Sequence, residues 1–97
     1  MKVLFLPAAE AEHLEQVAYY ESKQTGLGAR YLAEVNAALE YIAEAPHRFR
    51  VVRPPALRQL DLKLFPFAIY FRESDDVVFI AAVAPHRRRP GYWHGRL

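Results

Sequence analysis

The feature that most restricts the fold of this 97-residue chain is an almost unbroken apolar run near its end, from Val77 to Val83. A strand with apolar side chains on both sides needs both sides covered, so the run predicts the central strand of a sheet. Because a chain of this length supports a single core, we expect one domain over residues 1–97.

Two amphipathic helices are predicted before that strand. The first begins at Pro7, since proline is favoured in the first turn of a helix, and runs to about Lys23. The second ends before Pro46, which cannot continue a helix. The 3–4 spacing gives each helix one apolar stripe: Ala11, Leu14, Val17 and Ala18 in the first, and Leu32, Val35, Ala38 or Leu39, and Ile42 in the second. The short connection Gly26-Leu27-Gly28 makes the pair an antiparallel hairpin.

Strands are predicted before and after the helix pair in the sequence. One precedes it at residues 2–6, and three follow it, at residues 57–64, 67–72 and 77–83. In the first of the three, Leu60, Leu62 and Leu64 alternate with polar residues. Residues 47–56 are expected to form a loop, because they contain Arg53-Pro54-Pro55. The predicted fold is α+β with the order β-α-α-β-β-β: the last three strands form an antiparallel meander, the first strand returns beside them, and a C-terminal tail follows.

The composition disfavours several kinds of chemistry. Without cysteine, the chain has no disulfide scaffold, thiolate zinc site or cysteine nucleophile. The four histidines show no metal-ligand spacing and are expected at the surface. Neither Ser22 nor Ser74 has a base nearby in the sequence, and no glycine-rich phosphate loop is present. We therefore expect no cofactor and no metal. Since no apolar run approaches a membrane span, we expect a soluble, cytoplasmic protein without membrane contact.

Charge is divided unevenly between the two halves of the chain. Residues 46–97 hold ten of the thirteen basic residues but only four of the eleven acidic ones. Ten of the basic residues are arginines, which pair carboxylates and phosphates bidentately. This basic half predicts an anionic partner, either nucleic acid or an acidic protein segment.

The C-terminal tail holds the most unusual group of residues, in which His86 and the arginines Arg87 to Arg89 precede Tyr92 and Trp93. Cations beside aromatic rings suit nucleic-acid binding, and they also suit the centre of a protein interface. Alternatively, Tyr92 and Trp93 fold back over the core while the arginines pair with glutamates of the helices. A second aromatic pair, Tyr19-Tyr20, is expected to place one ring inward and one at the surface.

A series of short motifs along the chain resembles one known family. The motifs, in order, are Tyr19-Tyr20-Glu21, Gly26-Leu27-Gly28-Ala29-Arg30-Tyr31-Leu32, Ile42 followed by Pro46, Arg58, Phe65-Pro66-Phe67-Ala68-Ile69-Tyr70, Ala82-Val83-Ala84 and Arg88-Arg89-Pro90-Gly91-Tyr92-Trp93. Together they resemble the ParE toxins of the RelE/ParE superfamily of type II toxin–antitoxin systems. The resemblance spans almost the whole chain and implies the same β-α-α-β-β-β order. One departure is that Pro85 occupies the place where relatives commonly carry a histidine, and His86 follows it.

The resemblance implies three alternative functions. In the ParE-like branch, the chain would be a plasmid-stabilisation toxin that binds and inhibits DNA gyrase without catalytic residues. In the RelE-like branch, it would be a ribosome-dependent messenger RNA endoribonuclease, for which the candidate catalytic residues are Arg58, Arg87 and Tyr92. A third alternative is a family member that has lost toxicity and acts as a regulatory or structural partner.

We favour the ParE-like alternative, because the Phe65-Pro66-Phe67 turn stands where the nuclease branch tends to carry a basic residue. The resemblance then implies a cognate ParD-like antitoxin, DNA gyrase as target, and contact with operator DNA only through the antitoxin. The expected partner-binding residues are Arg58, Arg72, Arg87, Arg88, Arg89, Tyr92 and Trp93.

Overall fold

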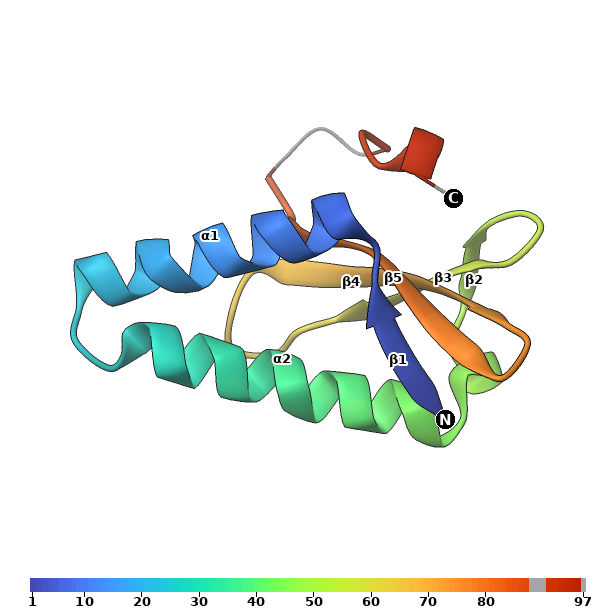
Figure 1. Ribbon diagram of the computed structural model, residues 1–97, viewed down its shortest axis with the longest axis horizontal. Coiled ribbons are helices and arrows are strands. Elements are labelled where there is room, and N and C mark those ends of the chain that lie inside the picture. Colours follow the sequence, from blue (N-terminus) through green and yellow to red (C-terminus); the bar gives the residue numbers. More distant parts are fainter. Residues whose placement is uncertain (88–90, 97) are drawn as a thin grey trace.

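The computed structural model of the chain describes residues 1–87 and 91–96. It has the predicted α+β architecture, in which two antiparallel helices pack against one face of a single sheet (Figure 1). The elements in chain order are β1 (Lys2–Phe5), α1 (Pro7–Lys23), α2 (Leu27–Glu44), a short 3₁₀ helix (Pro46–Arg48), β2 (Val51–Arg53), β3 (Leu57–Asp61), β4 (Phe67–Ser74), β5 (Val77–Pro85) and a second 3₁₀ helix (His94–Arg96).

The sheet has five strands in the order β1-β5-β4-β3-β2. Strands β3, β4 and β5 form the predicted antiparallel meander, and β1 returns beside β5 in parallel, with Lys2 opposite Val77 and Phe5 opposite Ile80. The apolar run therefore lies in an inner strand with a neighbour on each side. The middle of the five strands is nevertheless β4, because a fifth strand extends the sheet beyond β3.

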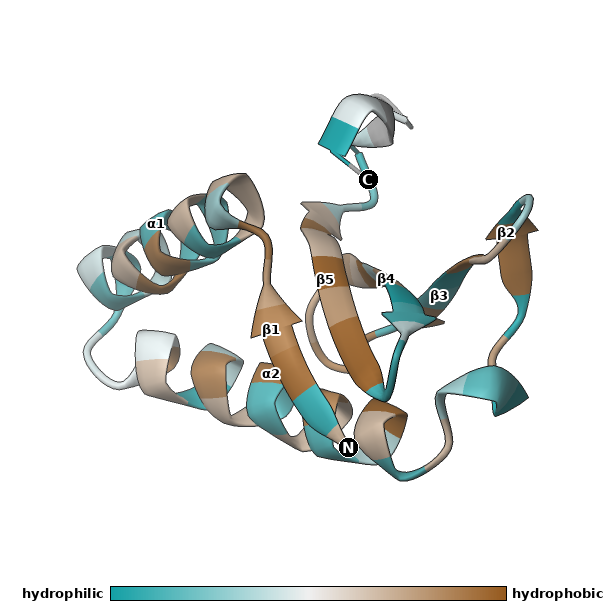
Figure 2. Ribbon diagram, turned by 45° about the vertical axis from the view of Figure 1, so that its right-hand side comes forward, coloured by the Kyte–Doolittle hydropathy of each residue, from teal (hydrophilic) through white to brown (hydrophobic). Residues whose placement is uncertain are grey.

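Both faces of β5 are covered, as its composition requires. On the helix side, Val78, Ile80 and Val83 join a core with the buried α2 residues Tyr31 and Val35. On the opposite side, the small residues Ala81, Ala82 and Ala84 pack with Leu57 and Trp93. Apolar residues run along β1 and β5 in Figure 2. Alanines on the second face leave room for the C-terminal residues to lie close to the sheet.

Two predicted strand boundaries were wrong. Residues 51–53, expected in a loop, form the edge strand β2, which pairs antiparallel with β3. Strand β3 ends at Asp61 rather than Leu64, because the Glu34 carboxylate accepts hydrogen bonds from the backbone N–H groups of Lys63 and Leu64. These bonds draw the chain out of the sheet toward α2, and they leave Leu64 79% exposed.

The buried face of α1 also differs from the predicted stripe. Ala9 and His13 are buried, whereas Leu14 is 58% exposed and Ala11 and Ala18 are exposed. The His13 ring stacks on Phe5 at a centroid distance of 5.2 Å and an interplanar angle of 18°, and it lies 5.9 Å from the Tyr31 ring. These ring contacts turn α1 so that the imidazole, rather than Leu14, faces the core, and they correct the expectation that every histidine lies at the surface.

Burial of His13 makes the stability of the domain sensitive to acid. Desolvation lowers the pKa of its imidazole below 6.5, although the nearby Glu10 carboxylate opposes the shift. The unfolded chain therefore takes up a proton at this imidazole more readily than the folded chain does. The free energy of unfolding is fully retained above pH 6.5 and falls as the pH drops below that value. We expect His13→Phe, which keeps an aromatic ring between Phe5 and Tyr31, to reduce this acid-induced loss in the free energy of unfolding.

Urea unfolding at neutral and mildly acidic pH would measure the effect. The control is His47→Gln, because His47 is exposed and its replacement leaves the buried imidazole in place. The prediction fails if wild type and His13→Phe lose the same free energy of unfolding on acidification.

Candidate functional site

A groove forms where the C-terminal end of β5 passes α1. It consists of two adjoining hollows of about 320 and 460 Å³ that share Gln16, Tyr19, Pro85 and Arg87. We call it the α1–tail groove, and its described lining residues are Glu12, Glu15, Gln16, Tyr19, Tyr20, Pro66, Phe67, Val83, Pro85, His86, Arg87 and Tyr92. Side chains from three separate parts of the chain therefore surround one surface hollow.

The wall opposite α1 is placed by the end of the sheet. Phe67 at the start of β4 pairs with Pro85 at the end of β5, and the His86 N–H donates a hydrogen bond to the Pro66 carbonyl at 2.9 Å. The Phe67 N–H donates to the Phe65 carbonyl at 2.8 Å, which closes the turn. The Phe65-Pro66-Phe67 turn thus holds the chain at the point where Arg87 leaves the sheet.

The wall on α1 carries the two adjacent tyrosines, and the prediction that they face different ways is confirmed. Tyr20 is half-buried and contacts the rings of Tyr31, Phe65 and Phe67. Tyr19 is 48% exposed and meets Tyr20 edge-on at 5.8 Å. Burial raises the pKa of the Tyr20 hydroxyl above its ordinary value.

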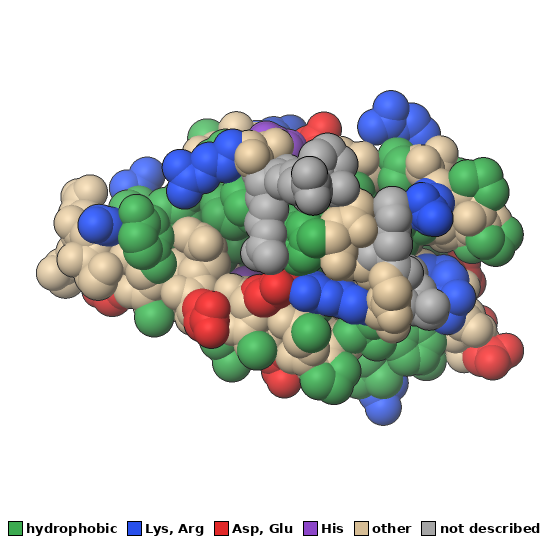
Figure 3. Space-filling model, turned by 90° about the horizontal axis from the view of Figure 1, so that it is seen from above, with side chains coloured by type: hydrophobic (Ala, Val, Ile, Leu, Met, Phe, Trp, Pro, Cys, Tyr) green, Lys and Arg blue, Asp and Glu red, His purple; other side chains and the backbone are tan. Residues whose placement is uncertain are grey.

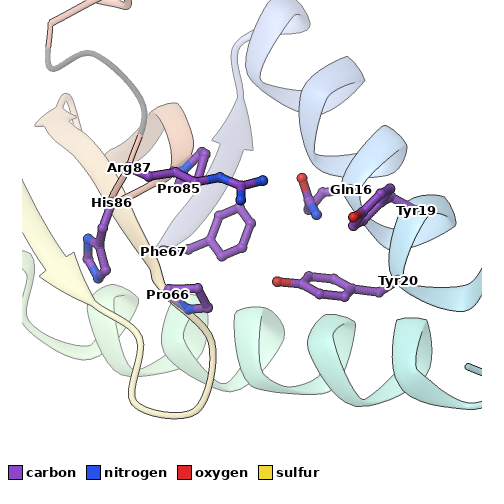
Figure 4. Close-up of a pocket in the computed structure, with 8 residues that line it drawn as sticks. All are labelled: Gln16, Tyr19, Tyr20, Pro66, Phe67, Pro85, His86 and Arg87. Carbon is purple, nitrogen blue, oxygen red and sulfur yellow. The ribbon is translucent and has the colours of Figure 1, made fainter. Parts of the chain in front are cut away.

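The Arg87 guanidinium points across the groove toward α1 (Figure 4). Its side chain makes no ion pair or hydrogen bond with the described residues, and it is exposed. In the same view, Pro66 lies between the His86 ring and Tyr20. The groove therefore offers a guanidinium, an amide and phenols above an apolar floor, beside the carboxylates of Glu12 and Glu15, which suits binding of a surface of mixed charge.

An arginine outside the predicted set attaches the C-terminal residues to the helix layer. Arg96 donates two hydrogen bonds of 2.8 Å to the two carboxylate oxygens of Glu12 and one of 3.1 Å to the Ala81 carbonyl. Hydrogen bonding to Glu12 raises the pKa of the Arg96 guanidinium. The pair joins α1 to the second 3₁₀ helix and so fixes where Tyr92 lies in the groove. Figure 3 shows cationic side chains spread over this face among apolar ones, with acidic side chains beside them.

The two tail aromatics have different environments. Trp93 is 5% exposed and stacks on Tyr70 at a centroid distance of 4.0 Å and an angle of 25°. It covers the second face of the sheet, as in the alternative in which the tail folds back, but Arg87 makes no ion pair with a helix glutamate among the described residues. Tyr92 is half-buried, contacts Trp93 edge-on at 5.1 Å and lines the groove. Of the two, Tyr92 is the ring that a partner in the groove would touch.

The remaining predicted residues lie elsewhere. Arg58, on β3, donates hydrogen bonds to the His47 and Phe49 carbonyls, which ties the segment after α2 to the sheet and does not bring Arg58 into the groove. Arg72, on β4, lines a separate pocket beside Trp93. Arg88 and Arg89 lie outside the described residues. Glu12 and Gln16 line the groove although they were not among the predicted residues; their spacing with Tyr19 and Tyr20 marks one side of α1.

A metal site and a membrane-spanning helix each have requirements with which the described residues can be compared. None of their His, Asp and Glu side chains form a group of three or more that could hold a metal ion. Among the same residues, no helix combines the length and the apolar character needed to cross a membrane.

Comparison with known proteins identifies the family. The model of the ParE toxin of type II toxin–antitoxin systems, parDE, matches residues 3–90, which include both walls of the groove and its arginine. The chain belongs to the ParE toxin family. One curated relative of this ParE family member is "Putative toxin Y4kP" of Sinorhizobium fredii, which is 32% identical over 73 residues and covers 75% of this chain and 76% of the relative.

A solved structure agrees with the ParE fold. The structure described as the chromosomal ParDE TA system from P. aeruginosa superposes with a TM-score of 0.74, covering 88% of this chain and 95% of that one. The sequence identity is 17%, so this likeness concerns the fold. Membership of the ParDE toxin–antitoxin family implies an antitoxin partner for this ParE protein.

Proposed function

We propose that this ParE family member inhibits DNA gyrase by binding it, and that a cognate ParD-like antitoxin in the cytoplasm neutralises the toxin. The observation that carries the proposal is the α1–tail groove, in which Arg87 is exposed and unpaired among the described residues beside Tyr19 and Tyr92. An exposed guanidinium between aromatic rings is typical of residues that contribute most to protein–protein binding. In this proposal the antitoxin, rather than the toxin, contacts operator DNA, and the system stabilises its plasmid.

The same geometry gives less support to the nuclease alternative. The candidate set Arg58, Arg87 and Tyr92 is divided, since Arg58 is engaged by backbone carbonyls away from the groove. Among the described residues, no hydrogen bond joins the Arg87 side chain to that of Tyr19 or His86, so no acid–base pair is formed there. Acid–base catalysis needs such groups within hydrogen-bond reach of the reacting atoms.

A supercoiling assay with purified gyrase tests the proposal. We expect the wild-type chain to inhibit supercoiling, and Arg87→Gln to need roughly tenfold to a hundredfold more protein, because a charge-assisted contact is worth ~1.5–3 kcal/mol at an interface. Arg30→Gln is the matched control, since Arg30 is an exposed arginine at the start of α2, outside the groove.

Two outcomes would overturn the proposal. Full gyrase activity in the presence of excess chain would exclude gyrase as the target. Cleavage of messenger RNA on ribosomes that is abolished by Tyr92→Phe would favour the endoribonuclease instead. If neither assay responds and expression does not arrest growth, the chain is a non-toxic member of the family.

A further inference from the structure

A second pocket lies on the face of the sheet that the helices do not cover. It has a volume of about 150 Å³ and opens between the β2–β3 connection, β4 and the C-terminal residues. Its cationic walls are Arg53 and Arg72, and its apolar walls include Pro54, Pro55 and Trp93. The α1–tail groove shares none of these residues, so the pocket is a separate site.

The Arg72 side chain is the feature that indicates a ligand in this pocket. Its side chain is half-buried, and its Nε atom is shielded from solvent without a hydrogen-bond partner. Among the described residues the guanidinium makes no ion pair, and Glu73, its neighbour on β4, alternates to the opposite face of the sheet. Burying a guanidinium donor without a partner is costly, and the Nε–H donor of Arg72 is in that position. Because Arg72 lines the pocket, an anion there would pair with the part of the guanidinium that faces the pocket.

We propose that this pocket binds a carboxylate side chain from an acidic segment of a protein partner. The planar guanidinium matches a carboxylate in a bidentate arrangement, and a hydrogen bond between two charged groups is stronger than one between neutral groups. Nucleic acid fits less well, because Trp93 is 5% exposed and already stacked on Tyr70, so it offers no free ring for a base.

The neighbouring strand favours a peptide as the source of the carboxylate. Arg53 ends β2, the outermost strand of the sheet, and β2 pairs only with β3 among the described residues. An extended segment can pair with such an edge while it places alternate side chains into a neighbouring pocket. The inference rests on the function proposed above only in naming the antitoxin as the protein that would supply this segment.

The chain carries its own reporter for the test, because its single tryptophan, Trp93, lines the pocket. The probe is a short capped peptide with two glutamates, and the matched glutamine peptide is its control. We expect the glutamate peptide alone to change Trp93 fluorescence in a saturable way. Arg72→Gln should weaken this binding about tenfold, whereas Arg72→Lys, which keeps the charge but loses the planar fork, should give an intermediate loss.

Arg30→Gln controls for the change in net charge, since it removes an exposed arginine from the helix layer. Circular dichroism and thermal unfolding of each variant check that the fold persists. Equal weakening in Arg30→Gln and Arg72→Gln, the absence of saturation, or tighter binding of inorganic phosphate or a single-stranded RNA would overturn the inference. The measurement needs neither gyrase nor antitoxin, so its failure is distinguishable from failure of the proposed function.

Discussion

Replacing Tyr31 by alanine is expected to lower the free energy of unfolding by about 3–5 kcal/mol, the loss typical of a large aromatic residue removed from a core. The Tyr31 ring is fully buried at the centre of an aromatic group, with centroids 5.1 Å from Tyr20, 5.3 Å from Phe65 and 5.2 Å from Phe67. A domain of this size has only roughly 5–15 kcal/mol of stability. Denaturant unfolding should therefore show a greatly lowered midpoint or a largely unfolded chain.

Tyr31→Phe provides the matched comparison, because it removes only the hydroxyl. That hydroxyl is buried and has no hydrogen-bond partner among the described residues, so it contributes the cost of desolvation without the gain of a bond. We expect Tyr31→Phe to leave stability unchanged or to raise it by about 1 kcal/mol. A loss in Tyr31→Phe as large as that in Tyr31→Ala would mean that the hydroxyl, rather than the ring, stabilises the domain.

The same cluster explains how the fold supports the candidate site. Tyr20 lies between the core and the α1–tail groove, since it contacts Tyr31 on one side and lines the groove on the other. Phe67 does the same from the sheet, because it touches Tyr31 and forms part of the groove floor. If the chain inhibits gyrase as proposed, loss of the Tyr31 ring should weaken that inhibition through the position of these two residues.

The parts of the fold that the sequence predicted are those with strong local signals. Pro46 ends α2 wherever that helix packs, and the apolar run from Val77 requires cover on both faces in any arrangement. The face of α1 had no such signal, because its small alanines allow several helix orientations. The rings of Phe5 and Tyr31, which meet His13 only after folding, select the orientation that exposes Leu14.

Long-range contacts also explain which site residues could be predicted. Arg87 and Tyr92 stand out as a cation and a ring in a short tail, and both line the groove. The contribution of Glu12 was not predictable, because it depends on an ion pair with Arg96, 84 residues away. Edge strand β2 was missed for a similar reason: its three residues have little pattern of their own, and only pairing with β3 makes them a strand.

The connection between the helices is the second place where one substitution should have a large effect. A Cβ atom at Gly28 would lie 2.6 Å from the Val17 carbonyl oxygen and 2.9 Å from the Glu21 Cβ, closer than such atoms approach in proteins. The Glu21 carboxylate also accepts hydrogen bonds of 2.9 and 3.0 Å from the backbone N–H groups of Gly26 and Gly28. A side chain at Gly28 would have to push the two helices apart and break this cap.

We therefore expect Gly28→Val to destabilise the domain by about 3 kcal/mol, near the upper end of the usual cost of overpacking. Gly95→Ala is the control, because a Cβ at Gly95 meets no atom within 4 Å. Denaturant unfolding of both variants measures the difference. Since α1 carries one wall of the groove, Gly28→Val should also weaken the proposed gyrase inhibition, whereas Gly95→Ala should retain it. If Gly28→Val unfolds at the wild-type midpoint, the helices are free to separate at this end, and the close approach of Gly28 to α1 does not stabilise the hairpin.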